Sequence, residues 1–168
     1  VNSVSYYAMS IASGVTVTST SSHTTNIESN NTSSNDENIY LDLNGNNLGA
    51  LTINLTGHDV YLGSAIGVSG QLTLTVGDII CESDLNGNNS QPYAATNTLT
   101  LKDGATVSGG SVSSHVIGAI RAESSGTTEI EFPVGDGTNH RPVYLQPDAT
   151  TATTYTVEYV NVGHSSMA

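Results

Sequence analysis

The chain has 168 residues, of which only 11% are charged, and its net charge is −12 at pH 7. Its only basic residues, Lys102, Arg121 and Arg141, cannot neutralise a nucleic-acid backbone or hold an anionic membrane surface. We therefore expect no nucleic-acid partner, and no run of about 18 apolar residues predicts membrane insertion. The chain begins at Val1 with no signal peptide, so we expect a mature form or a fragment of a longer protein.

Residues 1–37 are predicted to form an N-terminal segment of two short strands and a long polar loop. Apolar and β-branched residues recur up to about residue 17, and a break at Ser13-Gly14 separates the two strands. Residues 19–38 contain almost no apolar side chain beyond Ile27, which predicts a surface loop. Four side chains of this loop are candidate cation ligands: Asn35, Asp36, Glu37 and Asn38. The favoured interpretation is a solvated loop.

Residues 38–110 carry an internal repeat. The sequence D-L-N-G-N-N at Asp42 returns unchanged at Asp84, 42 positions later, and apolar tripeptides follow half of that period. Leu51-Thr52-Ile53 and Leu72-Thr73-Leu74 lie 21 positions apart, and Leu99-Thr100-Leu101 is predicted to be a third copy after an insertion. These six apolar side chains are expected to point inward in two stacked columns. Self-similarity at about 20 residues, with one or two short strands in each unit, predicts a solenoid of stacked coils.

The same period predicts further stacked pairs. Ile39 is expected beside Val60, Val60 beside Cys81, and Leu55 beside Val76. Cys81 is the only cysteine, so an internal disulfide is excluded. Its place in an inward column predicts a buried, inert thiol, with an intermolecular disulfide or a reactive thiol as the alternatives.

The two copies of D-L-N-G-N-N are predicted to be tight turns. Their Asn-Gly dipeptides supply the positive φ angles that such turns need. Asp42 and Asp84 are also candidate calcium ligands, but the glycine is fourth in the motif and position twelve after Asp42 is Ile53. A calcium loop of the EF-hand type needs glycine at the sixth position and a bidentate Glu at the twelfth. Turn chemistry is therefore the favoured interpretation, and calcium binding is the alternative.

Residues 111–168 are predicted to form an antiparallel β unit. Alternating apolar residues place its three or four strands at about 127–134, 141–146 and 153–161. Scattered tyrosines at strand positions offer stacking platforms for sugars, although they more often close a core.

Three motifs in the second half of the chain resemble a known family. They are L-T-L-x-x-G-A-T-V-S-G-G-S from Leu99, S-H-V-I-G from Ser114 and F-P-V-G-D-G-T-N-H-R-P-V from Phe132. Together they resemble modules of large secreted surface proteins of Bacteroidetes-type bacteria, in which repeats rich in L-T-L form solenoids. The resemblance implies a secreted protein at the bacterial cell surface.

Candidate catalytic and metal-binding residues form no recognisable motif. The five histidines lack the H-x-H and H-E-x-x-H spacings, so separate surface or turn positions are expected: His23, His58, His115, His140 and His164. A glycosidase needs two carboxylates across a cleft. Six acids are candidates for such a pair: Asp59, Asp78, Glu82, Asp84, Glu129 and Glu131. β-Helical polysaccharide enzymes are much longer than this chain, so we expect no enzyme, no cofactor and no metal site.

Arg121 and Arg141 are expected to be structural, because an isolated arginine in an acidic chain usually pairs with a carboxylate or with backbone carbonyls. Arg141 is predicted to anchor the turn at Asp136-Gly137. Lys102 has one alternative, a covalent staple to an asparagine side chain.

The fold predicted from these patterns is all-β: a short right-handed β-solenoid of about 21-residue coils, capped by an antiparallel β unit. A β-sandwich is the alternative. The expected function is a non-catalytic structural or adhesive module of an extracellular surface protein or filament, which associates with itself or with neighbouring domains. A carbohydrate-binding module is the second possibility. The N-terminal strands, which have no partner in the repeat, are expected to cap the solenoid or to add to a neighbouring subunit.

Overall fold

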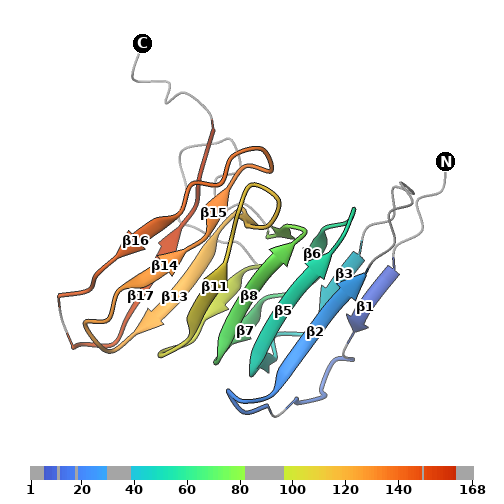
Figure 1. Cartoon of the computed structure of the whole chain (residues 1–168). Helices are drawn as coiled ribbons and strands as arrows, with labels where there is room; N and C mark the ends of the chain where they lie inside the picture. Colours follow the sequence, from blue (N-terminus) through green and yellow to red (C-terminus); the bar gives the residue numbers. More distant parts are fainter. Residues whose placement is uncertain are drawn as a thin grey trace, which may run out of the picture.

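The computed structural model describes residues 6–10, 12–17, 19–29, 39–81, 97–148 and 150–161. Every regular element in these ranges is a β-strand, so the prediction of an all-β protein is confirmed (Figure 1). In the same ranges, no helix is long and apolar enough to cross a membrane.

Most strands belong to three sheets, which we call A, B and C. Sheet A is parallel and consists, in spatial order, of β1 (Tyr6–Ser10), β3 (Ile39–Asp42), β6 (Val60–Leu62), β9 (Ile79–Ile80), β12 (Val116–Ile117) and β15 (Val134–Gly135). Sheet B is parallel and consists of β2 (Thr24–Ser29), β5 (Ala50–Leu55), β8 (Gln71–Val76) and β11 (Thr106–Gly109). Sheet C consists of β4 (Asn47–Leu48), β7 (Ile66–Val68), β10 (Leu99–Leu101), β13 (Ile120–Ser124) and β17 (Thr153–Val157), of which β17 is antiparallel.

Successive strands visit the three sheets in a fixed order. The chain passes from sheet A to sheet C to sheet B through β3, β4 and β5, and it repeats that order through β6, β7 and β8 and through β9, β10 and β11. Each new strand pairs with the strand that entered the same sheet one passage earlier. Figure 1 shows the strands of sheet B side by side, with strands of the other sheets behind them.

Aliphatic side chains stack between the sheets because strand alternation sends every second residue inward. In sheet B, Leu51 lies beside Leu72, and Leu72 lies beside Val107. In sheet C, Leu99 lies between Ile66 and Ile120, and all three are buried. Buried residues from all three sheets form a single hydrophobic cluster.

Part of the predicted register is confirmed. Ile39 pairs with Val60, and Leu51 pairs with Leu72, each 21 positions apart. Leu99 and Leu101 point inward as expected, but the prediction that they continue the columns of sheet B is wrong. They belong to sheet C, and Val107 of β11 takes the expected place beside Leu72.

Two other predicted pairs are wrong. Val60 pairs with Ile79 instead of Cys81, because the connection through Gly77 (φ 89°) and Asp78 makes this passage of the chain two residues shorter. The pair of Leu55 with Val76 is lost because an irregularity in the ladder after Ile53 sets Asn54 opposite Val76.

The N-terminal prediction also needs correction. The predicted loop at 19–38 contains β2, which pairs with β5 over its whole length and buries Ile27. The second predicted strand, around Val15 and Val17, is absent from the described residues there. β1 pairs with β3 of its own chain, so it covers an edge of sheet A in the monomer.

The C-terminal segment contains the predicted antiparallel pairs. β14 (Ile130–Phe132) pairs with β16 (Val143–Leu145), and β17 pairs with β13. The first predicted strand, however, ends at residue 134, and Val134 belongs to β15, which joins sheet A as a parallel strand. Strands from all three predicted segments, such as β1, β6 and β12, therefore share one sheet.

Candidate functional site

Several candidate residues lie outside the described part of the chain. They are Asn35, Asp36, Glu37, Asn38, Glu82, Asp84 and His164. Among the residues that the structure describes, no group of three or more His, Cys, Asp or Glu side chains is arranged to hold a metal ion.

Asp42 serves the turn that follows β3. Its Oδ1 accepts a hydrogen bond of 3.0 Å from the backbone N–H of Asn44, which is the residue at φ 49°. Gly45 follows at φ 78°, and Asn46 Nδ2 donates to the carbonyl of Leu43 at 2.7 Å. These contacts are the ones that an Asp-Leu-Asn-Gly-Asn turn requires, and they support the turn interpretation of the motif.

A groove of about 420 Å³ lies between the start of β11 and β14. Four carboxylates line it: Asp103, Glu123, Glu129 and Glu131. Tyr144 stands beside them and donates its hydroxyl to Glu131 Oε1 at 3.4 Å. The adjacent negative charge of Glu131 raises the pKa of Tyr144.

Two of these four carboxylates are held by structural partners. Glu123 pairs with Lys102, whose Nζ lies 2.6 Å from Glu123 Oε1. Asp103 accepts hydrogen bonds from the side chain and the backbone N–H of Ser125, and these bonds lower the pKa of Asp103. Asp103 is therefore held as an anion, whereas a glycosidase acid needs a raised pKa.

The remaining pair of candidate acids, Asp59 and Asp78, lies on neighbouring passages of the chain beside sheet A. Asp59 Oδ1 accepts the backbone N–H of Asp78 at 2.8 Å. Asp78 is buried, and loss of solvent is the main reason that its pKa is raised. Asp78 Oδ1 in turn accepts the backbone N–H of His115 at 2.9 Å, so both carboxylates are occupied by backbone hydrogen bonds.

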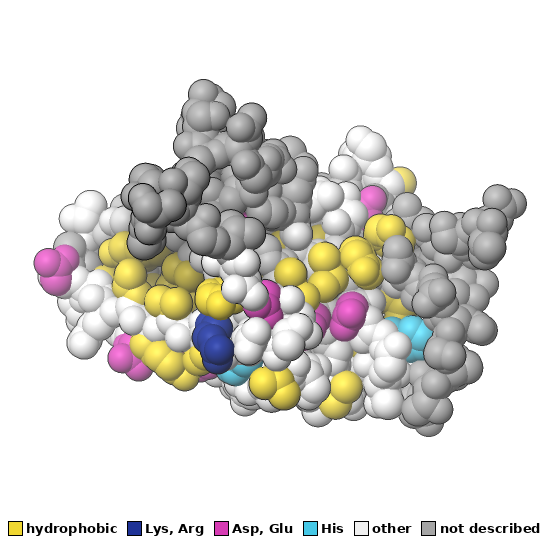
Figure 2. Space-filling model, turned by 90° about the horizontal axis from the view of Figure 1, so that it is seen from above, with side chains coloured by type: hydrophobic (Ala, Val, Ile, Leu, Met, Phe, Trp, Pro, Cys, Tyr) yellow, Lys and Arg dark blue, Asp and Glu magenta, His cyan; other side chains and the backbone are white. Residues whose placement is uncertain are grey.

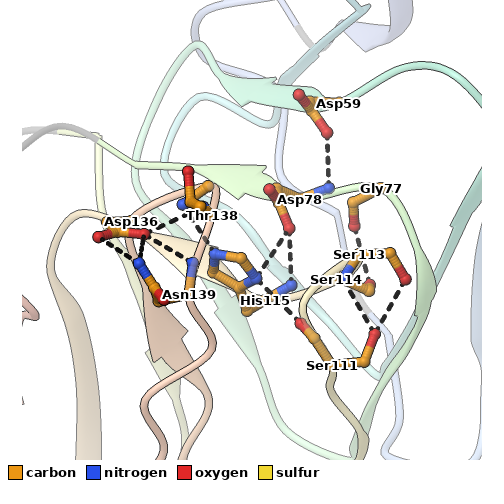
Figure 3. Close-up of polar contacts among 11 residues, drawn as sticks. Asp59, Gly77, Asp78, Ser111, Ser113, Ser114, His115, Asp136, Thr138 and Asn139 are labelled. Carbon is orange, nitrogen blue, oxygen red and sulfur yellow. Dashed lines mark hydrogen bonds and ion pairs between the residues drawn. The ribbon is translucent and has the colours of Figure 1, made fainter.

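The most elaborate polar cluster surrounds His115, which is completely buried (Figure 3). Its Nδ1 lies 3.0 Å from the carbonyl oxygen of Ser111 and 3.2 Å from Asp78 Oδ1. Its Nε2 lies 2.9 Å from the backbone nitrogen of Gly137. Its own backbone N–H donates to Asp78 Oδ1 at 2.9 Å. One imidazole therefore joins three separate segments of the chain.

A second histidine lies against this cluster. The rings of His115 and His140 have centroids 5.9 Å apart and are tilted by 32°. His140 Nε2 is buried without a hydrogen-bond partner. Burial, followed by the proximity of His115, lowers the pKa of His140. The sequence offered no spacing that links residues 25 positions apart, so the pair was missed, and both histidines were expected to be separate.

The turn between β15 and His140 is closed by Asp136. Its Oδ1 accepts the backbone N–H groups of Thr138 at 3.0 Å and Asn139 at 2.7 Å, which lower the pKa of Asp136. Arg141 contacts this turn through Asn139 Oδ1 at 3.3 Å. Arg141 was expected to anchor the turn, and its contact is with Asn139.

The remaining candidates have separate structural settings. His23 Nδ1 lies 2.7 Å from Thr20 Oγ1, and Arg121 Nη1 lies 3.5 Å from Thr98 Oγ1. Cys81 is buried as predicted, and loss of solvent raises the pKa of its thiol to about 12.

Sheet A carries a stripe of rings and aliphatic groups on its outer side. Tyr40 pairs with Tyr61, and their rings have centroids 5.7 Å apart with a tilt of 36°. Ile80 and Ile117 continue the same row across β9 and β12. The 21-residue period relates the two tyrosines, so this stripe could have been predicted from the repeat together with strand alternation.

Comparison with protein-family models, with curated proteins and with solved structures found no match.

Proposed function

We propose that the chain is a short right-handed β-solenoid, capped by its antiparallel strands, and that it serves as a non-catalytic structural or adhesive module of an extracellular surface protein or filament. One observation carries the proposal: three passages of the chain visit the three sheets in the same order and stack like residues on one another. Such stacking builds an elongated element that can be lengthened by further repeats.

The surface is consistent with this role. The face drawn in Figure 2 is mostly uncharged, and acidic side chains are scattered over it. Uncharged Ser, Thr and Asn side chains keep such a surface soluble with little charge. The net charge of −12 makes copies of the protein repel one another. Association therefore depends on short-range contacts, which must outweigh this repulsion.

A strand edge is the surface that supports self-association. β2 is the last strand of sheet B on one side. Ala50 donates its N–H to the carbonyl of His23, and Thr56 donates to the carbonyl of Ser29. Because residues of a parallel strand bond alternately to either side, the backbone groups of Asn26 face away from β5. Within the described part of the chain no strand pairs with this side of β2, so these groups are available to a strand of a second copy.

This proposal is tested by Asn26→Pro. Proline removes only the outward N–H of Asn26, and the ladder to β5 stays intact. Wild-type protein, examined by sedimentation velocity and negative-stain electron microscopy over a range of concentration and salt, should form elongated assemblies. The variant should form fewer of them with unchanged circular dichroism. A wild type that stays monomeric at every concentration would contradict self-association, and assembly that the variant does not reduce would exclude the β2 edge.

Carbohydrate binding is a second candidate, and the Tyr40–Tyr61 stripe favours it. Adjacent aromatic rings on a sheet face suit the apolar faces of sugar rings. A glycan array with the isolated protein tests this candidate. Any glycan that binds should be lost with Tyr61→Ala and retained with Tyr144→Ala, which removes an exposed tyrosine away from the stripe. An array without binding would remove this candidate.

A further inference from the structure

His115 is held in one protonation state by the groups around it. The backbone N–H of Gly137 can only donate, so Nε2 of His115 must accept that hydrogen bond with its lone pair. The carbonyl of Ser111 can only accept, so Nδ1 carries the proton. The buried ring is therefore neutral, with its proton on Nδ1.

A second proton on the His115 ring is incompatible with the hydrogen bond from Gly137. A proton on Nε2 would point at the N–H of Gly137, and two donors would face each other at 2.9 Å. The ring already lies against the backbone of β15, where it occupies the space that a Cβ at Gly135 would need. The turn at 136–139 is the part that can yield, since Gly137 and Thr138 in it are exposed.

We propose that His115 is an acid-sensitive latch: protonation of its Nε2 breaks the hydrogen bond from Gly137 and releases the turn at 136–139 from sheet A. His140 strengthens the response, because it follows the turn directly and its ring lies against that of His115. When both rings are charged, their repulsion acts in the direction that opens the turn.

Several charged groups surround the rings of His115 and His140. Asp78 Oδ1 lies 3.2 Å from Nδ1 of His115, and Asp59 binds the backbone N–H of Asp78 from the preceding passage of the chain. Glu131 faces His140 and favours its charged form. Within the turn itself, Asp136 is bonded to the backbone, and Arg141 is bonded to Asn139. Among the described contacts none of these groups is bonded to Nε2 of His115, so a proton on that nitrogen leaves the N–H of Gly137 without its acceptor.

Hydrogen exchange of the Gly137 amide tests the latch in the wild-type protein. The protection factor, corrected for the intrinsic effect of pH, should fall by about tenfold or more between about pH 7.5 and about pH 5, which is the loss expected for one hydrogen bond. The amide of Leu72, in the middle of sheet B, should keep its protection. Imidazole ¹⁵N spectra at the higher pH should show His115 protonated on Nδ1.

The matched variant is His115→Gln. The Gln carbonyl can accept from Gly137 but does not titrate, so the protection of that amide should become independent of pH. His23→Gln, which changes an exposed histidine remote from the cluster, should leave the wild-type response unchanged.

Three results would overturn the latch. The first is a Gly137 protection factor that does not change with pH in the wild type. The second is a loss of protection that Leu72 shares, which would indicate global unfolding. The third is an Nε2-protonated ring at the higher pH, and this result stands even if His115→Gln fails to fold.

Discussion

Leu74 illustrates what the stacked interior demands of a single side chain. It is 3% exposed and stands beside Ile53 in sheet B. Leu74→Asp would place an unpaired charge in an aliphatic column, which we expect to cost about 3 kcal/mol or more and to unfold the domain. Urea denaturation followed by circular dichroism measures this cost.

The neighbouring Thr73 supplies the control for that substitution. Its side chain lies on the other face of the same strand, so Thr73→Asp should change the free energy of unfolding by less than about 1 kcal/mol. A soluble, fully folded Leu74→Asp protein would show that the inward register of β8 is wrong.

Cys81 should be protected chemically as well as sterically. A thiol with a pKa of about 12 carries almost no reactive thiolate at neutral pH. A thiol reagent should therefore label Cys81 slowly in the native protein and rapidly in denaturant. Rapid labelling of the native protein, or a dimer that disappears on reduction, would contradict the buried position.

His140 makes stability depend on pH in a definite direction. Its pKa is lowered from 6.5 in the folded protein, so the unfolded chain binds this proton more readily. The stability that depends on a neutral His140 is fully present above about pH 6.5 and is lost as the pH falls through the folded pKa. Wild-type protein should therefore lose more stability between about pH 7.5 and about pH 5.5 than His140→Gln does.

Asp78 contributes with the opposite sign. Its pKa is raised in the folded protein, so its contribution grows as the pH falls toward 3.8. Asp78 is present in both proteins, so comparison over the same pH interval reduces its share of the difference, and the effect of His140 on the pKa of Asp78 remains within that difference. Equal losses in the wild type and in His140→Gln would contradict the assigned direction.

At the scale of single strands, β1 has a defined role. It covers the edge of β3 in its own chain, with Tyr6 beside Ile39. Deleting residues 1–17 should leave β3 as an exposed edge and should increase self-association, because an uncovered strand offers unpaired backbone groups. Light scattering after gel filtration measures the change. If the truncated chain associates less than the full chain, β1 works between subunits instead.

The strands also show where sequence reasoning succeeds and fails. The register of β5 on β8 was predictable, because both strands alternate aliphatic and polar residues in phase with the repeat. β2 was missed because it buries a single aliphatic residue, Ile27, which is enough for a strand at the end of a sheet. β10 was placed in the wrong sheet because L-T-L alternation is the same in every sheet of the molecule.

For the whole molecule, composition and alternation predicted the all-β class and the buried aliphatic interior. They could not predict the polar cluster at His115, because its members come from Asp78, Ser111 and Gly137, which only the winding of the chain brings together.

Long-range contacts in solution test that winding most directly. A three-dimensional NMR spectrum of the isotope-labelled protein should contain parallel-strand contacts between Leu51 and Leu72, between Leu72 and Val107, and between Leu99 and Ile66. All three together require successive passages through separate sheets. Close Hα–Hα contacts between β5 and β8, which arise only from antiparallel neighbours and would be expected of a sandwich, would contradict the account.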